Sequence, residues 1–262
     1  MTASTTSRAT GGRTRLDGSA SLAWVVLAAA VAEVVAPVVT INGPGASPGN
    51  GSGPELLITP VGWAFSIWGV IYTLALAQAV AVLVRGPGAV SRRLQVDLLV
   101  LYLGGTVWIV VAGLDSSLAT ATALLVMLVA AVDAVLTVSR LRLGPSWFAA
   151  LTRSAVGLYA GWVTAAFFLN ASTALVDQGV VEADTVGWQL GVLVLAAGAL
   201  LGVLTASRGV PAYAVAGVWA LLGIAVTGAT GEHPSVLVLA LVGAVAIAAA
   251  ALVVRRRAGA AT

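Results

Sequence analysis

Regularly spaced aromatic side chains are the residues of this sequence best suited to binding chemistry. Phe65, Trp68 and Tyr72 are three and four residues apart, so they share one face of a helix. Tyr159 and Trp162 have the same spacing in a later segment. Two such faces can wall a cavity for a flat apolar ligand that stacks on the rings. The alternative is that these rings only pack between helices and form a belt at a membrane surface.

Acidic residues inside apolar runs are the second chemical signal. Glu33 is near the middle of the first run, and Asp133 is in the fourth. A carboxylate at membrane depth is costly unless it is paired, hydrated or protonated, which predicts proton coupling or ligand contact for Glu33. A neutral, hydrogen-bonded structural residue is the other interpretation, and Asp133 is within reach of Arg140 or Arg153. The predicted ligand-binding residues are Trp63, Phe65, Trp68, Tyr72, Trp108, Tyr159, Trp162, Asn170 and Glu33.

Metal sites and conventional catalysis have little support in the sequence. There is no cysteine, and the single histidine, His233, stands beside Glu232 in a predicted loop. The sequence contains no P-loop, nucleophile elbow or paired-histidine motif, so we predict no catalytic residues and no metal. We expect no required cofactor. A porphyrin or heme is expected to bind as a ligand, by stacking rather than through its iron.

Eight long apolar runs must position these side chains. Crossing a bilayer takes about 20 mostly apolar residues. With 60% hydrophobic and 9% charged residues, the chain could not cover the surface of a soluble fold. We therefore predict an all-α, polytopic membrane protein of about eight transmembrane helices. The expected helices are 22–42, 61–84, 96–113, 117–139, 147–170, 186–206, 210–228 and 234–254.

The basic residues predict the orientation of these helices. All thirteen are arginines, and they fall in the two tails, in alternate links and at one helix start, whereas the other links carry acids. By the positive-inside rule both termini are cytoplasmic, as in a multi-pass protein of the cell membrane. The net charge of +3 then indicates contact with anionic lipid headgroups and not with nucleic acid. An arginine-only, alanine-rich chain is also typical of a high-GC bacterial genome.

The N-terminal region allows two interpretations. Arg13, Arg15 and the run that follows, with Ala30-Val31-Ala32, are similar to a secretory signal and its cleavage site. The apolar run continues to Ile41, which favours an uncleaved helix. The predicted organisation is a disordered cytoplasmic tail over 1–20, five helices over 21–172, an outer loop over 173–185, three helices over 186–254 and a basic cytoplasmic tail over 255–262.

The two aromatic faces resemble motifs of the tryptophan-rich sensory protein or translocator protein family (TspO/MBR). Tyr159 to Asn170 reads YAGWVTAAFFLN, similar to the family's YLAWVSFATxLN. Thr59 to Tyr72 reads TPVGWAFSIWGVIY, similar to PPxWxFxxxWxxLY but one residue shorter between Phe65 and Trp68. In the third helix Trp108 matches the family's NxxW, while Gly105 stands where that pattern has asparagine.

The resemblance covers about residues 22–172 and implies a five-helix bundle that binds porphyrins or sterols in tetrapyrrole sensing or transport. The last three helices lie outside it. Two alternatives remain open: a proton-coupled transporter that uses Glu33, and an intramembrane enzyme acting on a tetrapyrrole or isoprenoid. Expected partners are membrane lipid and a hydrophobic small molecule. A homodimer packed through Gly157 and Gly161 is a further expectation.

Overall fold

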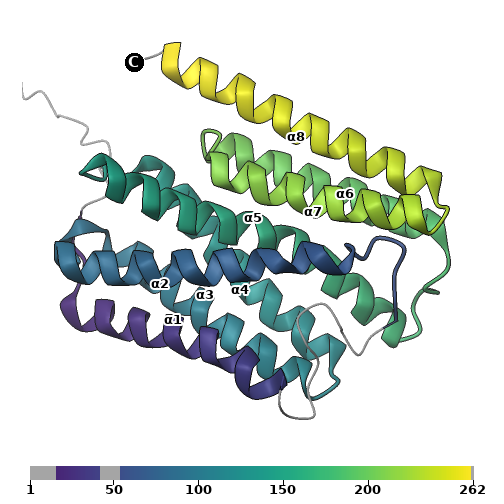
Figure 1. Cartoon of the computed structure of the whole chain (residues 1–262), viewed down its shortest axis with the longest axis horizontal. Coiled ribbons are helices and arrows are strands. Elements are labelled where there is room, and N and C mark those ends of the chain that lie inside the picture. Colours follow the sequence, from purple (N-terminus) through teal and green to yellow (C-terminus); the bar gives the residue numbers. More distant parts are fainter. Residues whose placement is uncertain (1–15, 42–53, 261–262) are drawn as a thin grey trace, which may run out of the picture.

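The computed structural model describes residues 16–41 and 54–260, and every regular element in those ranges is helical. Eight of the described helices are long and apolar enough to cross a membrane, which confirms the predicted fold class. Both ends of the helical part lie at the same end of the bundle (Figure 1); we name it the terminal end, and the opposite one the distal end. The helices are α1 (Ala20–Ile41), α2 (Ile67–Arg85), α3 (Arg92–Ala112), α4 (Ser117–Arg140), α5 (Ser146–Asp177), α6 (Val186–Ala206), α7 (Pro211–Thr230) and α8 (Pro234–Ala260).

Local sequence signals account for several helix boundaries. The Ser91 hydroxyl accepts a hydrogen bond from the Leu94 N–H at the start of α3, and Ser116 caps α4 in the same way through Ala119. Pro211 is the first residue of α7, where its missing N–H costs no helical hydrogen bond. The sequence-based boundaries are therefore close to the observed ones.

The largest differences from the predicted bounds are at the C-terminal ends of α5 and α8. α5 continues through Asp177, so the outer loop expected over 173–185 begins only after that residue. Polar residues near its end do not break the helix because their side chains bond to its own carbonyls: Ser172 Oγ donates to Phe168 O (2.8 Å) and Thr173 Oγ1 to Leu169 O (3.2 Å). α8 likewise continues through the arginines of the expected C-terminal tail to Ala260.

The segment before α1 corrects the predicted N-terminal tail in part. Asp17 Oδ1 accepts a hydrogen bond from the Arg92 N–H (3.0 Å), where the positive end of the α3 dipole favours a carboxylate. The Gly18 N–H donates to Val90 O (3.0 Å), and Ser19 N–H donates to Gln95 Oε1 (2.8 Å). Residues 17–19 are thus bonded to the start of α3, and the disordered tail expected over 1–20 was wrong for them. Residues 1–15 lie outside the described ranges.

The first five helices form a closed ring. α1 packs against α2 and α3, α2 packs against α5, and α4 joins α5 to α3. The core inside this ring contains large buried side chains, among them Tyr102, Tyr159 and Leu101. The aromatic faces predicted on α2 and α5 therefore meet inside one bundle.

The last three helices pack against the outside of this ring. α7 packs along α5, α6 contacts both α5 and α7, and α8 covers α6 and α7 (Figure 1). α8 is consequently the outermost helix on this side. The three additional helices are thus packed onto the five-helix ring rather than attached to it through a linker.

Candidate functional site

Trp68 is the centre of an aromatic cluster inside the ring. Its indole stacks on Tyr72 with ring centroids 5.4 Å apart and on Trp108 at 5.6 Å. The rings of Tyr159 (5.8 Å) and Trp162 (6.2 Å) meet it edge to face. Both arrangements are favourable for aromatic quadrupoles. The structure therefore brings together five of the residues selected from sequence, from helices α2, α3 and α5.

A short 3₁₀ helix before α2 explains how Trp68 reaches this position despite the shorter motif. The chain forms a 3₁₀ helix over Gly62–Ser66 and becomes α-helical at Ile67. Residues three apart eclipse each other in a 3₁₀ helix, whereas they are rotated by about 60° in an α-helix. Phe65 and Trp68 accordingly contact the same neighbour, Trp162. The ring centroids of Phe65 and Trp162 are 5.7 Å apart.

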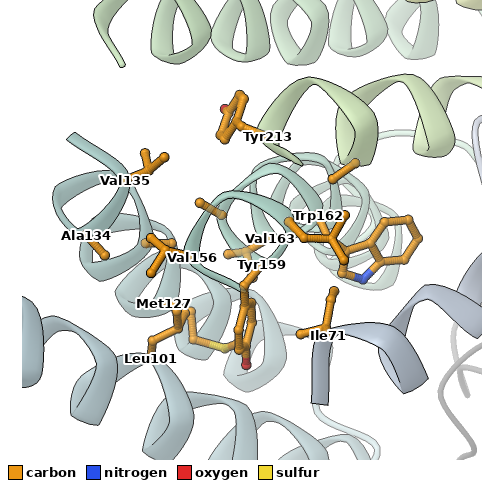
Figure 2. Close-up of a cluster of buried hydrophobic side chains, with 14 of the residues drawn as sticks. Ile71, Leu101, Met127, Ala134, Val135, Val156, Tyr159, Trp162, Val163 and Tyr213 are labelled. Atoms are coloured by element: carbon orange, nitrogen blue, oxygen red, sulfur yellow. The ribbon is translucent and has the colours of Figure 1, made fainter. Parts of the chain in front are cut away.

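Side chains of α5 point to different parts of the ring interior. Figure 2 shows Tyr159 projecting between Leu101 and Ile71, while Trp162 projects towards α2. Asn170, two turns further along α5, accepts a hydrogen bond from Trp108 Nε1 (3.3 Å) and donates to Ala166 O (3.0 Å). The asparagine predicted as a ligand contact is therefore already bonded to a tryptophan of the cluster.

Glu33 of α1 is almost fully buried, at 1% exposure. One carboxyl oxygen, Oε1, accepts a hydrogen bond from the Tyr159 hydroxyl. The other, Oε2, has no hydrogen-bond partner in the described part of the chain. Glu33 forms no ion pair with any described residue. A buried polar oxygen without a partner is uncommon in native proteins, which marks Glu33 as a functional candidate.

Gly105 provides the space that Glu33 occupies. A Cβ atom at this position would overlap Glu33 Oε1 and lie 2.8 Å from the Tyr159 hydroxyl oxygen. In the family pattern an asparagine stands at the position of Gly105. Here the Glu33 carboxyl group of α1 occupies the space beside that position. The polar contact is supplied by a different helix.

A cavity of about 50 Å³ lies between the aromatic cluster and the last three helices. The side chains on its first wall include Trp68, Trp108, Trp162 and Asn170, and the indole N–H groups of Trp68 and Trp162 have no hydrogen-bond partner among the described residues. The opposite wall is apolar. It consists of Val192, Leu193, Ala196 and Leu200 of α6 with Ala220, Leu221 and Ile224 of α7.

The sequence contained no signal for this second wall. Small and branched apolar residues at helical spacing are as common on lipid-facing helices as on helices that line a cavity. Only the packing of α7 on α5 distinguishes the two cases. We find that the last three helices, which sequence analysis left without a role, complete the cavity.

Residues 59–64, which precede α2, are joined to α7 by hydrogen bonds. Val61 N–H donates to Gly223 O (3.2 Å), and Thr227 Oγ1 donates to Thr59 O (2.7 Å). Trp219 Nε1 donates to Ala64 O (2.7 Å). These three bonds hold residues 59–64, which we name the lid, against α7, and Pro60 of the lid lines the cavity.

Trp63 lies in the lid and not in the aromatic cluster. It is 46% exposed, and its ring meets Trp219 of α7 with centroids 4.9 Å apart. It does not line the cavity. Trp63 was selected because it belongs to the motif that resembles the family; in the structure its ring packs on α7.

The two glycines expected to mediate a homodimer are used within the chain. A Cβ atom on Gly161 would lie 2.5 Å from Tyr213 O and 2.8 Å from Ala216 Cβ, and one on Gly157 would lie 2.7 Å from Val210 Cγ1. The Tyr213 hydroxyl donates to Thr164 Oγ1 (3.0 Å) across the same contact. Because α7 occupies this face, the glycine pair is not available to a second copy.

Asp133 lies away from the cavity, at the terminal end. Arg93 Nε donates to its Oδ2 (2.6 Å), and the guanidinium also bonds Oδ1. Its partner is therefore Arg93 and not Arg140 or Arg153, because α3 packs directly on α4.

His233 is in the α7–α8 turn, and no group of three or more His, Cys, Asp or Glu side chains that could hold a metal occurs among the described residues.

Comparison with known proteins agrees with this architecture. No curated protein and no solved structure matches the chain. The family model described as TSPO-like protein matches residues 20–253, a range that includes α6 and α7 and most of α8. A match over so much of the chain, together with the eight described helices that are long and apolar enough to cross a membrane, shows that this multi-pass membrane protein belongs to the TSPO-like family.

Proposed function

We propose that the protein binds a flat hydrophobic ligand, porphyrin-like or sterol-like, between its aromatic cluster and the α6–α7 wall, and acts in sensing or transport of that ligand. The observation that carries the proposal is the arrangement around Trp68, which lines an apolar cavity and contacts four other rings. Stacked indoles offer a planar molecule a large apolar contact area. The free N–H groups of Trp68 and Trp162 would pair with carboxylate or carbonyl groups at its edge.

Ligand entry requires the two walls to separate. The cavity measures about 50 Å³, whereas sites for drug-sized ligands span about 300–1,000 Å³. The first wall is held by ring stacking and by the Trp108–Asn170 hydrogen bond. The second wall contributes only apolar side chains, so we propose that α6 and the distal part of α7 move away from the cluster, together with the lid.

Porphyrin titration tests this proposal directly. Purified protein in detergent is titrated with protoporphyrin IX, and binding is followed by tryptophan quenching and by the porphyrin absorbance band. We expect saturable binding, which Trp68→Leu or Trp162→Leu weakens by about tenfold through loss of a stacking surface worth about 1.4 kcal/mol. Ala196→Phe, which fills the cavity from the opposite wall, should weaken binding as well.

Trp147→Phe is the matched control because Trp147 is 51% exposed at the start of α5, far from the cavity. It removes one indole from the fluorescence signal and should leave the dissociation constant unchanged. A cholesterol analogue replaces the porphyrin in a parallel titration. Absence of saturable binding for both ligands would contradict the proposal, as would equal effects of the cavity and control substitutions.

Proton-coupled transport of a lipophilic substrate is the second candidate. It is favoured by the buried Glu33 carboxyl group, whose Oε2 lacks a partner among the described residues. Glu33→Gln keeps the shape and an acceptor for the Tyr159 hydroxyl but cannot exchange a proton. If transport is proton-coupled, this variant in liposomes should retain ligand binding and lose uptake driven by a pH gradient.

The same pair of measurements separates this role from a structural one. Uptake that is unaffected by Glu33→Gln would exclude proton coupling at this residue. We propose no chemical turnover, because Glu33 and the Arg93-bound Asp133 belong to separate clusters and no two carboxyl groups line the cavity. Detection of a chemically altered porphyrin after incubation with the protein in the dark would contradict that view.

A further inference from the structure

Four exposed arginines lie in two segments that pack together, the end of α8 and the α6–α7 turn. Arg208 lies in that turn, and Arg255, Arg256 and Arg257 lie in the last turns of α8. We name these four residues the C-terminal arginine cluster. All four side chains are exposed, at the terminal end of the bundle.

Backbone packing brings the two segments together. Gly209 adopts a φ of +72°, and a Cβ atom at this position would lie 3.2 Å from Val254 Cγ1 and 3.3 Å from Arg255 Cγ. Arg208, directly before it, also has a positive φ of +59°. The turn is therefore held against α8, and this brings Arg208 close to Arg255. Because α8 stays helical through these residues, Arg255 and the two arginines after it are presented from a rigid support.

No acidic side chain neutralises this cluster. The ten acidic residues of the sequence are all described, and those nearest in sequence, Glu182, Asp184 and Glu232, lie in links at the distal end. None of the four guanidinium groups forms an ion pair or a hydrogen bond with a described residue. Two other arginines at the terminal end do have partners: Arg93 pairs with Asp133, and Arg153 donates to Leu141 O (3.1 Å).

The residues just before the arginines place the cluster at the depth of lipid headgroups. Leu252 and Val253 are exposed apolar side chains on α8, at 58% and 46%. An apolar, exposed helix surface that changes to arginine within one turn is expected where the hydrocarbon meets the headgroup layer. Guanidinium groups bind phosphate oxygens bidentately, and a cluster without acids attracts negative charge.

We propose that the C-terminal arginine cluster is a binding site for the headgroup of an anionic phospholipid. The phosphate lies between the Arg208 turn and the end of α8, and the acyl chains lie along the exposed surface of α8. Such a site joins the α6–α7 turn to the last helix and stabilises the packing of the three C-terminal helices. It is independent of the cavity and of any ligand bound there.

Lipid-dependent thermal stability tests this site. The purified full-length protein in a neutral detergent is supplemented with phosphatidylglycerol, phosphatidylcholine or sodium phosphate, and Tm is followed by intrinsic tryptophan fluorescence. We expect phosphatidylglycerol to raise Tm by about 5 °C more than phosphatidylcholine does, the size produced by a ligand well above its Kd. The double variant R208Q/R255Q should lose this difference, and R208K/R255K should retain most of it.

The double variant R92Q/R142Q is the matched control, because it removes the same charge from exposed positions of the terminal end. It should keep the full response. Equal loss in both double variants would show a general charge effect and overturn the proposal. An equal response to both lipids, or a response reproduced by sodium phosphate, would also overturn it. If R208Q/R255Q does not fold, native mass spectrometry of the wild-type protein with both lipids at equal concentration decides, and equal binding contradicts the site.

Discussion

Gly161→Val is expected to detach α7 from α5 and to lower the free energy of unfolding by about 3 kcal/mol, the upper end for overpacking a close helix contact. A Cβ atom at this position meets Tyr213 O and Ala216 Cβ, so the first obstacle is backbone, which cannot rotate away as a side chain can. The Tyr213–Thr164 hydrogen bond across the same contact would lengthen or break. Thermal unfolding in detergent, followed by intrinsic fluorescence, measures the loss.

Gly191→Ala is the control for this substitution. Gly191 lies within α6, and a Cβ atom there meets nothing within 4 Å. Removing a glycine from a helix interior at an unobstructed position should leave Tm unchanged or raise it slightly, because alanine restricts the unfolded chain. A Gly161→Val protein as stable as Gly191→Ala would show that α5 and α7 are not in close contact.

Gly105→Ala is expected to break the Glu33–Tyr159 hydrogen bond and to destabilise the protein by about 2 kcal/mol. The added methyl group would overlap the carboxyl group of Glu33, which is enclosed by α1, α3 and α5 and has little room to move. In a Glu33→Ala background, Gly105→Ala should lower the free energy of unfolding far less, because the Glu33 carboxyl group no longer occupies the space beside residue 105. A double-mutant cycle measures this coupling as the difference between the two costs.

The neighbouring glycine offers the control for this cycle. A Cβ atom on Gly104 would meet Met127 Cγ at 2.6 Å, the flexible side chain of a residue on α4. The cost of Gly104→Ala should therefore be the same with and without Glu33. Additive effects of Gly105→Ala and Glu33→Ala would mean that Glu33 does not occupy the space beside Gly105.

Periodicity and composition were sufficient to predict the eight helices and the aromatic faces. Apolar runs of about 20 residues have one interpretation in a chain this poor in charge, and ring spacing on a helix fixes which side chains share a face. The rings of Trp68 and Trp162, selected by this spacing, meet in the structure, and Trp108, selected by the family resemblance, stacks on Trp68. Trp63 instead packs on Trp219 of α7, and the 3₁₀ turn that precedes α2 has no clear signature in the sequence.

Contacts between distant segments could not be predicted. The sequence marked Glu33 as unusual, but its partner Tyr159 and the space at Gly105 depend on how α1, α3 and α5 meet. The same limit applies to Asp133, for which two candidate arginines were considered and a third is the partner. The apolar wall from α6 and α7 was missed because alanine, valine and leucine look alike whether they face lipid or a cavity.

The bonds between the lid and α7 determine when the cavity can be completed during synthesis. Thr59 and Thr227, which are joined by a hydrogen bond, are 168 residues apart in the chain. A ribosome makes the lid long before α7, so the nascent protein inserts its aromatic helices while the Val61 amide and the Thr59 and Ala64 carbonyls still await their partners. The cavity is therefore finished late in biogenesis, and a chain that stops after α5 would have the rings without an enclosure.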